Sequence, residues 1–416
     1  MDDRAAVSWI HRRAGFGLAR PDLDAAVARG PAGEIEALLA PEAVSAAVVA
    51  DPWDDADLPL ELKDRGAALG AITTWLDHMT ETTTPLVDRM AWLWHGHFVS
   101  ALDKVKIARL MVDQLRLFRS SGLGSFAGLL RAVTIDPAML LYLDGTDSTG
   151  EHPNENYARE VLELFTLGLG TYTEDDVKSG AAALTGWRAR RGEGTAEFVA
   201  RRHDDTPRTY LGVEGVHDVD TVVAAIMGHQ ALPGSIAAMI AREILGTTED
   251  VVVAPLAAAF AASGFDVTSL VRATLAAGVA GQFEPVVLAP VPWFVIAQRV
   301  TGSTVKGRMR LVGLRTAGQV PTTPPNVAGW PSGGAAWFGS STIVARATLA
   351  AAVAAGAPRD NAARMAADGN DLGELATALG LPTPTFDPAS SAALTSAEPG
   401  VERLALALCA PEFVIA

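Results

Sequence analysis

Only one cysteine, Cys409, occurs in this chain of 416 residues. A single thiol cannot form an internal disulfide, and it cannot supply the several thiolates of a cysteine-rich metal site. Basic residues are also in deficit, with 33 lysines and arginines against 48 aspartates and glutamates and a formal net charge of −15. Because nucleic acids and anionic membranes both attract basic proteins, we expect neither as a partner.

Long hydrophobic runs are absent as well. The most apolar stretch, "VVVAPLAAAFAASGF" from Val251, is too short to span a bilayer and is interrupted by Pro255. The first residues, "MDDRAAVSWIHRRAGFG", carry Asp2 and Asp3 and no apolar run, so they do not have the pattern of a signal peptide. We therefore expect the chain, as given, to be cytoplasmic.

The common catalytic and nucleotide-binding motifs are missing too. The sequence contains no GxGxxG, Walker A, HExxH or GxSxG pattern. Hydrophobic residues make up 49% and charged residues 19%, which is the balance of a globular protein. Apolar residues recur at spacings of three and four from residue 22 to residue 280. We predict a mostly α fold, with a multi-helical, bundle-like body that forms a single domain over residues 1–416.

Three segments interrupt the helical pattern. Residues 189–215 are polar and contain several glycines, and we predict a small β-hairpin there between 196–204 and 209–212. Residues 318–340 are rich in proline, glycine and tryptophan, which predicts a long ordered loop, because tryptophans pack and residues before proline are restricted. Residues 357–400 have the composition of a variable, Ala/Pro/Ser-rich excursion.

The stretch "HPNENYAREVLELFTLGLG" (152–170) carries an unusual helical pattern. On a helix over 154–167, the polar residues fall within roughly a 100° arc and apolar side chains cover most of the rest. A surface helix shows the converse. We therefore expect this helix to be buried nearly all round, with a polar stripe that runs through protein and consists of Asn156, Arg159, Glu160 and Glu163.

Buried carboxylates need an ionic partner or a cation, and two interpretations of the stripe follow. In one, Arg159 and Glu163, four residues apart, form an internal salt bridge. In the other, which we favour, Glu160 and Glu163 reach one point from i, i+3 positions and serve a metal ion or acid–base chemistry. Glu155 lies at the edge of the stripe, nearer the start of the helix.

Two histidines in "WLWHGHFVS" are candidate ligands or acid–base groups. His95 and His97 lie roughly 200° apart on an unbroken helix, so both can face one metal only if Gly96 loosens the turn or the helix ends there. The alternative for each is a hydrogen-bonded core histidine between Trp94 and Phe98.

Two further polar stretches have open interpretations. His203 beside Asp204 is either a catalytic pair or part of a solvent-facing turn. "HRRAGFG" (11–17) is either a basic turn that binds an anion or an electrostatic clamp on the acidic body.

Eight stretches, considered together, point to one family. They are "HRRAGFG" (11–17), "WHGHFVS" (94–100), "DPAMLLYLDG" (136–145), "NENYAREVLELFTLGLGTYTEDDV" (154–177), "ALTGW" (183–187), "HDDTPRTYLG" (203–212), "PPNVAGWP" (324–331) and "APEFVIA" (410–416). The chain thus resembles, over nearly its whole length, the large bacterial family of unknown function known as DUF1800. That resemblance leaves export of the native form open, because many members of the family look exported.

The resemblance implies a set of recurrent polar positions. They are His95, His97, Lys104, Asp144, Asn154, Glu155, Asn156, Arg159, Glu160, Glu163, Thr185, Trp187, His203, Asp204, Asn326 and Trp330. One departure stands out. The family often has a basic and an acidic residue in an element that here reads "VLAPVPW" (287–293), where the chain has Leu288 and Pro292. If those charges serve the family's chemistry, this member has an altered substrate preference or has lost activity.

We expect an enzyme with one deep polar site that depends on a divalent metal and is hydrolytic or oxidative. The expected metal ligands are Glu160, Glu163, His95 and His97. The expected catalytic residues are Glu155, His203, Asp204 and Arg159. The expected substrate-binding residues are Asn154, Asn156, Lys104, Trp187, Trp330 and Trp337.

Two alternatives stay open. One is a metal-free enzyme that processes glycans with paired carboxylates about 5–9 Å apart. The other is a non-catalytic binding or scaffold protein whose polar stripe is an internal ion network. The expected substrate is therefore a small molecule or a glycan.

Overall fold

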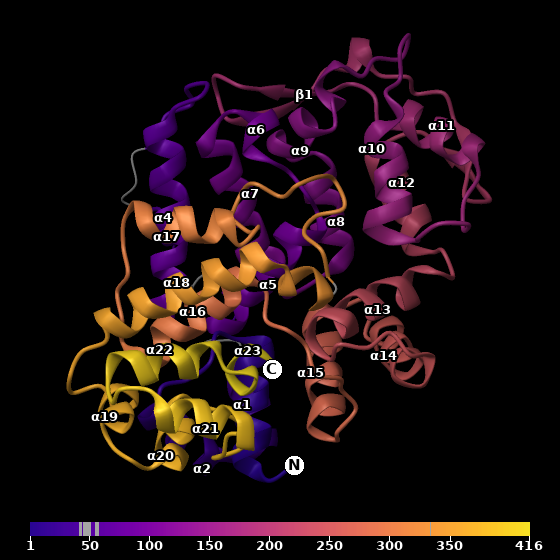
Figure 1. Cartoon of the computed structure of the whole chain (residues 1–416). Helices are drawn as coiled ribbons and strands as arrows, with labels where there is room; N and C mark the ends of the chain where they lie inside the picture. The colour runs from indigo at the N-terminus through magenta and orange to yellow at the C-terminus, as the bar shows by residue number, and fades with distance from the viewer. Residues whose placement is uncertain (41–43, 45–50, 55–57, 333) are drawn as a thin grey trace.

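The computed structural model describes residues 1–40, 44, 51–54, 58–332 and 334–416. It confirms the mostly α prediction, because helices form almost all of the regular structure and the strands make two small antiparallel sheets. Figure 1 shows the first helices and the last helices side by side at one end of the molecule, and the β-strands at the other.

The first third of the chain is mostly helical in its described residues. Asp2 caps its first helix by accepting a hydrogen bond from the amide of Ala5 at 2.7 Å. The helices are α1 (Asp3–Ala14), α2 (Arg20–Leu39), α4 (Arg65–Glu81), α5 (Pro85–His97), α6 (Leu102–Val105), α7 (Ala108–Ser121), α8 (Phe126–Thr134) and α9 (Pro137–Tyr142).

The middle of the chain mixes short helices with two β-hairpins. Its elements are the 3₁₀ turn η1 (Gly145–Asp147), α10 (Glu155–Glu160), the π-helix η2 (Val161–Thr166), α11 (Glu174–Ala183), β1 (Trp187–Arg190), β2 (Thr195–Phe198), η3 (Ala200–Arg202), β3 (Arg208–Tyr210), β4 (Val213–Val216) and α12 (Val219–Met227). Strand β1 pairs with β2, and β3 pairs with β4.

This pairing differs from the single hairpin expected between 196–204 and 209–212. Each strand pairs with its immediate neighbour because a tight turn joins β1 to β2 and another joins β3 to β4. The second turn has positive φ at both Leu211 (52°) and Gly212 (79°), which is the conformation of a two-residue hairpin turn.

The last part of the chain returns to helices. They are α13 (Leu232–Ile244), α14 (Asp250–Ala262), α15 (Val267–Val279), α16 (Pro290–Thr301), α17 (Arg308–Thr316), the 3₁₀ turn η4 (Gly334–Phe338), α18 (Ser340–Gly356), α19 (Ala362–Asp368), α20 (Leu372–Ala378), α21 (Pro388–Ser396), α22 (Val401–Cys409) and α23 (Pro411–Val414). The predicted loop 318–340 has no strand or α-helix before Ser340 among its described residues, and Gly333 lies outside them.

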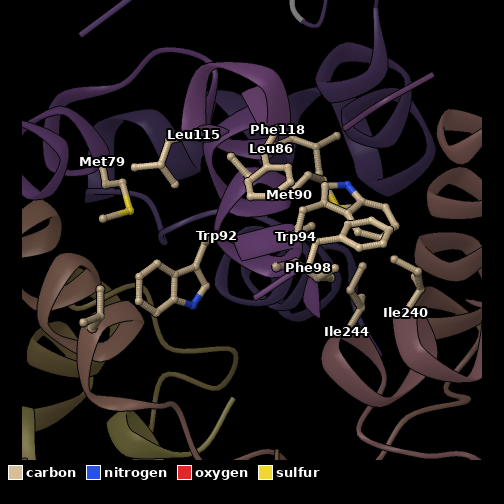
Figure 2. Packing of buried hydrophobic residues seen from close by; sticks show 14 of the residues in the cluster. Met79, Leu86, Met90, Trp92, Trp94, Phe98, Leu115, Phe118, Ile240 and Ile244 are labelled. Carbon is tan, nitrogen blue, oxygen red and sulfur yellow. The ribbon is translucent and has the colours of Figure 1, made fainter. Parts of the chain in front are cut away.

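Helix α5 lies in the core. Pro85 occupies its first turn, where the missing N–H costs nothing. Trp94 and Phe98 stack at 5.4 Å, and Figure 2 shows them next to Ile240 and Ile244 of α13, whereas Trp92 points to another side of the helix. The helix therefore has two packing faces, one that carries Trp94 and Phe98 and one that carries Trp92.

Buried arginines connect the two ends of the sequence. Arg12 is buried and donates to the carbonyl oxygens of Phe413 (2.6 Å) and Ile415 (3.3 Å). Ser8 donates to the carbonyl of Gly380 at 2.6 Å. These bonds hold α1 against the C-terminal helices that lie beside it in Figure 1.

No single helix in the described ranges is long and apolar enough to cross a bilayer. Helices α12 and α13 reach the required length and hydropathy only together, and they meet at a bend of 79°.

Candidate functional site

A pocket of about 160 Å³ is lined by residues of α1, α5, α13, α16 and the loop before α18. Its charged and titratable lining residues are Arg13, Arg89, His97, Arg242 and Glu243. Three tryptophans also line it: Trp92, Trp330 and Trp337. We call this site the arginine–tryptophan pocket.

Helical spacing explains why these side chains meet. On α5, Arg89, Trp92 and Gly96 follow one another at intervals of three and four residues, so they share one face. On α13, Arg242 and Glu243 stand at the end of an otherwise apolar helix and point into the same pocket.

Arg13 both clamps the fold and lines the pocket. Its Nη1 donates to the carbonyl of Ile244 at 3.1 Å, and its Nη2 donates to the carbonyls of Glu284 and Ala416 at 2.5 Å. Burial, assisted by the neighbouring charge of Arg89, lowers the pKa of Arg13 to about 9. The guanidinium therefore stays charged at neutral pH. In "HRRAGFG", Arg13 clamps backbone carbonyls, and anion binding by this stretch stays a prediction.

Arg89 and Arg242 have free donors. Arg89 uses Nε to donate to the carbonyl of Arg13 at 3.1 Å, but its buried Nη1 has no hydrogen-bond partner in the described part of the chain. Burial lowers the pKa of Arg89, and the charge of Glu243 opposes that shift. Arg242 is exposed and forms no hydrogen bond or ion pair with any described residue. An unpaired buried donor is costly, so an anion in the pocket would relieve this cost.

Glu243 is the one acidic residue that lines the pocket within the described ranges. It is partly buried, and no described arginine or lysine nitrogen comes within the 4.0 Å of a salt bridge. Burial raises the pKa of the Glu243 carboxyl, while the charges of Arg89, Arg242 and Arg13 act in the opposite direction. Three positive charges against one negative charge leave the pocket basic in a chain whose net charge is −15.

His97 ends α5 at the pocket wall. Its Nε2–H donates to the carbonyl of Phe165 at 2.9 Å, which leaves Nδ1 as the acceptor nitrogen. Burial lowers the pKa of His97 to about 4, so the ring is neutral at neutral pH. His97 was expected to bind a metal together with Glu160 and Glu163. Only its Nδ1 could do so, because its Nε2 already bonds the carbonyl of Phe165.

His95 is fully buried and holds the long loop. Its Nε2 accepts a hydrogen bond from the amide of Thr322 at 3.0 Å, and its ring lies edge-on to Trp330 with centroids 5.3 Å apart. Burial lowers the pKa of His95 to about 3. This is the geometry of the core histidine that the sequence left as an alternative to a ligand.

The tryptophan wall is built by contact between α5 and the loop 318–340. Trp92 and Trp330 stack with centroids 5.1 Å apart and planes 15° from parallel. Trp337 lines the same pocket and is almost fully buried. Trp330 and Trp337, both expected to contact a substrate, thus lie in the pocket.

The departure at Leu288 and Pro292 also falls here, because both residues line the arginine–tryptophan pocket. Backbone pairing holds this segment: the amide of Leu288 donates to the carbonyl of Val414 at 2.9 Å, and Val287 bridges Ile415. At the two positions where the resemblance implies charged residues, this chain therefore has apolar side chains that form part of the pocket wall.

The polar stripe of 154–167 lies at the surface, contrary to the expectation of burial. Arg159 bonds Glu155 at 3.1 Å and Glu174 at 2.7 Å, and the side chains of Arg159 and Glu155 are 33% and 42% exposed. Most apolar side chains of 154–167 face the core, as predicted. The polar side chains face water instead of a second layer of protein.

Glu160 and Glu163 share this surface. Glu163 accepts a hydrogen bond from the hydroxyl of Tyr172 at 2.8 Å. Burial, and then the charge of Glu163, raises the pKa of Glu160. Over the described residues, no group of three or more histidine, cysteine, aspartate or glutamate side chains is arranged to hold a metal ion. Metal dependence stays a prediction.

The predicted substrate-binding residues near this helix form a local network. Lys104 pairs with Asp144 at 2.8 Å, and the amide of Asn156 donates to the same carboxylate at 3.3 Å. Asn154 caps α10 by accepting from the backbone N–H of Asn156 at 2.8 Å. These contacts explain the residue types without a ligand.

His203 and Asp204 lie in a separate, open polar groove near η3. His203 donates from Nδ1 to the carbonyl of Thr185 at 3.0 Å, and Asp204 forms an ion pair with Arg208. Trp187 packs against Phe198 at 5.4 Å in the adjacent hairpin. The structure does not bring these three residues into the arginine–tryptophan pocket.

Sequence reasoning missed Arg89, Arg242 and Glu243. A usable signal exists on α13, where Arg242 and Glu243 are the sole charges in the helix Leu232–Ile244. A charged pair at the end of an apolar helix indicates either a cap or a site, and nothing in the sequence reveals the arginines that face it.

The match to a known family covers almost the whole chain. Residues 9–415 match the family described as "Protein of unknown function (DUF1800)". The chain belongs to the DUF1800 family. No curated protein and no solved structure matches it. Of the stretches that resemble this DUF1800 family, "HRRAGFG", "WHGHFVS" and "PPNVAGWP" each contribute to the arginine–tryptophan pocket.

Proposed function

We propose that this DUF1800 protein binds a small organic anion in the arginine–tryptophan pocket. The observation that carries the proposal is the set of guanidinium donors of Arg89 and Arg242 that have no partner among the described residues. Guanidiniums recognise carboxylate and phosphate groups through paired N–H donors. Neither donor set is consumed by Glu243, which forms no ion pair with them.

The wall of the pocket favours an organic ligand over a bare inorganic ion. Trp92 and Trp330 present stacked rings, and Leu288 and Pro292 add apolar surface. A volume of about 160 Å³ is below the range of roughly 300–1,000 Å³ that is usual for drug-sized ligands. This volume favours a small molecule as the ligand.

Calorimetry with a panel of small carboxylates and phosphate esters tests this proposal. We expect at least one compound to bind, and we expect Arg89→Met or Arg242→Met to weaken it at least tenfold. Arg159→Met is the matched control, because Arg159 lies in a surface ion network outside the pocket. A panel without binders, or equal affinities for all three variants, contradicts the proposal.

A second candidate function is acid–base catalysis on the bound anion. Glu243 and the Nδ1 of His97 are the two proton acceptors in the pocket wall that have no protein partner in the described chain. In this candidate, the enzyme predicted from the sequence would act through Glu243 and His97 instead of the catalytic residues expected from the sequence. Incubation of each binder followed by mass spectrometry tests it: conversion should vanish in Glu243→Gln while binding persists, and a ligand that is never converted removes this candidate.

A further inference from the structure

The arginine–tryptophan pocket presents an unpaired carboxylate beside unpaired guanidiniums. We propose that its ligand carries an ammonium group as well as a carboxylate, and that it is an α-amino acid with an apolar side chain. This inference rests on the proposed function, whose anion it specifies. The ligand carboxylate would bind Arg89 and Arg242, and its ammonium group would bind Glu243.

Charge complementarity favours a zwitterion over a simple anion. A simple anion placed on Arg242 would bring a second negative charge close to Glu243, since the two residues are neighbours on α13. Like charges at close range in a partly buried site repel strongly. An ammonium group removes this repulsion and gives Glu243 a counter-charge that no described residue supplies at salt-bridge distance.

The remaining lining suits the other parts of such a ligand. Trp92, Trp330 and Trp337 supply aromatic lining beside the charged residues. Leu288 and Pro292 offer contacts for an aliphatic or aromatic side chain. The volume of about 160 Å³ favours a ligand of the size of an amino acid.

Glu243 also has a different way to tolerate an anion, namely by taking up a proton. The charged groups that face it are Arg13 on α1, Arg89 on α5 and Arg242 on its own helix, and His97 lies in the same wall. With a simple anion, binding would carry proton uptake. With a zwitterion, the ammonium group supplies the positive charge, so binding needs no proton uptake.

Calorimetry of matched ligand pairs separates these cases in the unmodified protein. The pairs are leucine with 4-methylpentanoate, and phenylalanine with 3-phenylpropanoate, each measured in two buffers of different ionisation enthalpy. We expect one amino acid to bind at least tenfold more tightly than its des-amino partner, with no proton uptake. A des-amino acid that binds equally or more tightly, with a proton taken up, overturns the inference and leaves the anion-binding function intact. If no member of either pair binds while other anions do, the inference also fails alone.

A pair of variants provides a second test of the inference. Glu243→Gln should erase the preference for the amino acid over its des-amino partner. Glu36→Gln, the matched control in a surface ion pair with Arg272, should preserve it. A preference that survives in Glu243→Gln contradicts the assignment of the ammonium group to this carboxylate.

Discussion

Gly329 lies directly against the backbone carbonyl of Gly96, so close that a Cβ atom on Gly329 would overlap that oxygen. This contact joins the loop 318–340 to α5 and places Trp330 on Trp92. Gly329 also has φ of 80°, a conformation that side chains disfavour.

Gly329→Ala should lower the free energy of unfolding by about 2 kcal/mol or more, because it combines overlap with backbone strain. Gly96→Ala is the matched control, since its Cβ would meet nothing closer than an atom of Trp330 at 3.8 Å. We expect it to be neutral or mildly stabilising in α5. Urea unfolding of both variants measures the difference, and equal stabilities would show that the contact does not form.

Arg159→Met should change the free energy of unfolding by less than about 1 kcal/mol, because the ion pairs of Arg159 are partly exposed and screened by water. The same urea experiment measures this change. A loss above about 3 kcal/mol would indicate that the stripe is buried, as the sequence pattern predicted.

Asp136 gives stability a pH dependence of unusual sign. It caps α9 and accepts from Gln114 at 2.7 Å, yet burial raises its pKa to about 7 against those hydrogen bonds. Between its usual pKa of 3.8 and 7, the folded state holds a proton that the unfolded state has lost, so this residue's contribution falls as pH rises. Asp136→Asn keeps the cap and cannot titrate. The stability of the variant relative to the parent should therefore rise from pH 4 to about pH 7 and then level off in urea titrations; a constant difference contradicts the shift.

Glu34 shows the opposite dependence. It is buried between His11 at 2.7 Å and Arg29 at 2.6 Å. Burial alone would raise its pKa, but these hydrogen bonds lower it to about 2. Its contribution is complete above the usual pKa of 4.5 and disappears as pH falls toward 2. Glu34→Gln should cost about 2 kcal/mol at neutral pH, and the cost should shrink below pH 4.5. A cost that does not change with pH contradicts this ion pair.

Apolar spacing predicted the mostly α fold correctly. Local sequence rules also explain the kink in α2 at Gly30, which has φ of 72° and precedes Pro31. They failed where the backbone leaves the α geometry. Beyond Glu160 the expected helix becomes the π-helix η2, so a period of 3.6 no longer describes which side chains share a face.

The site was harder to predict from the sequence. Periodicity shows that a helix has an apolar and a polar face, but it does not show whether protein or water covers the polar face. The polar arc of 154–167 therefore predicted a buried site where the structure has surface ion pairs. Arg89 and Arg242 stand on separate helices, and only the folded chain shows that they share a pocket with Trp330. Trp330 and Trp337 were predicted from the sequence because the loop 318–340 has an unusual composition, rich in proline, glycine and tryptophan.

The hydrogen bonds of Arg12 to Phe413 and of Arg13 to Ala416 bear on how the chain is made. They close over intervals of 401 and 403 residues, so the pocket wall near Arg13 can assemble only after residues 413–416 have been synthesised. Domains synthesised from the N-terminus often begin to fold before release. Here α1 is synthesised long before these partners, so Arg12 and Arg13 stay without their carbonyl acceptors during that interval.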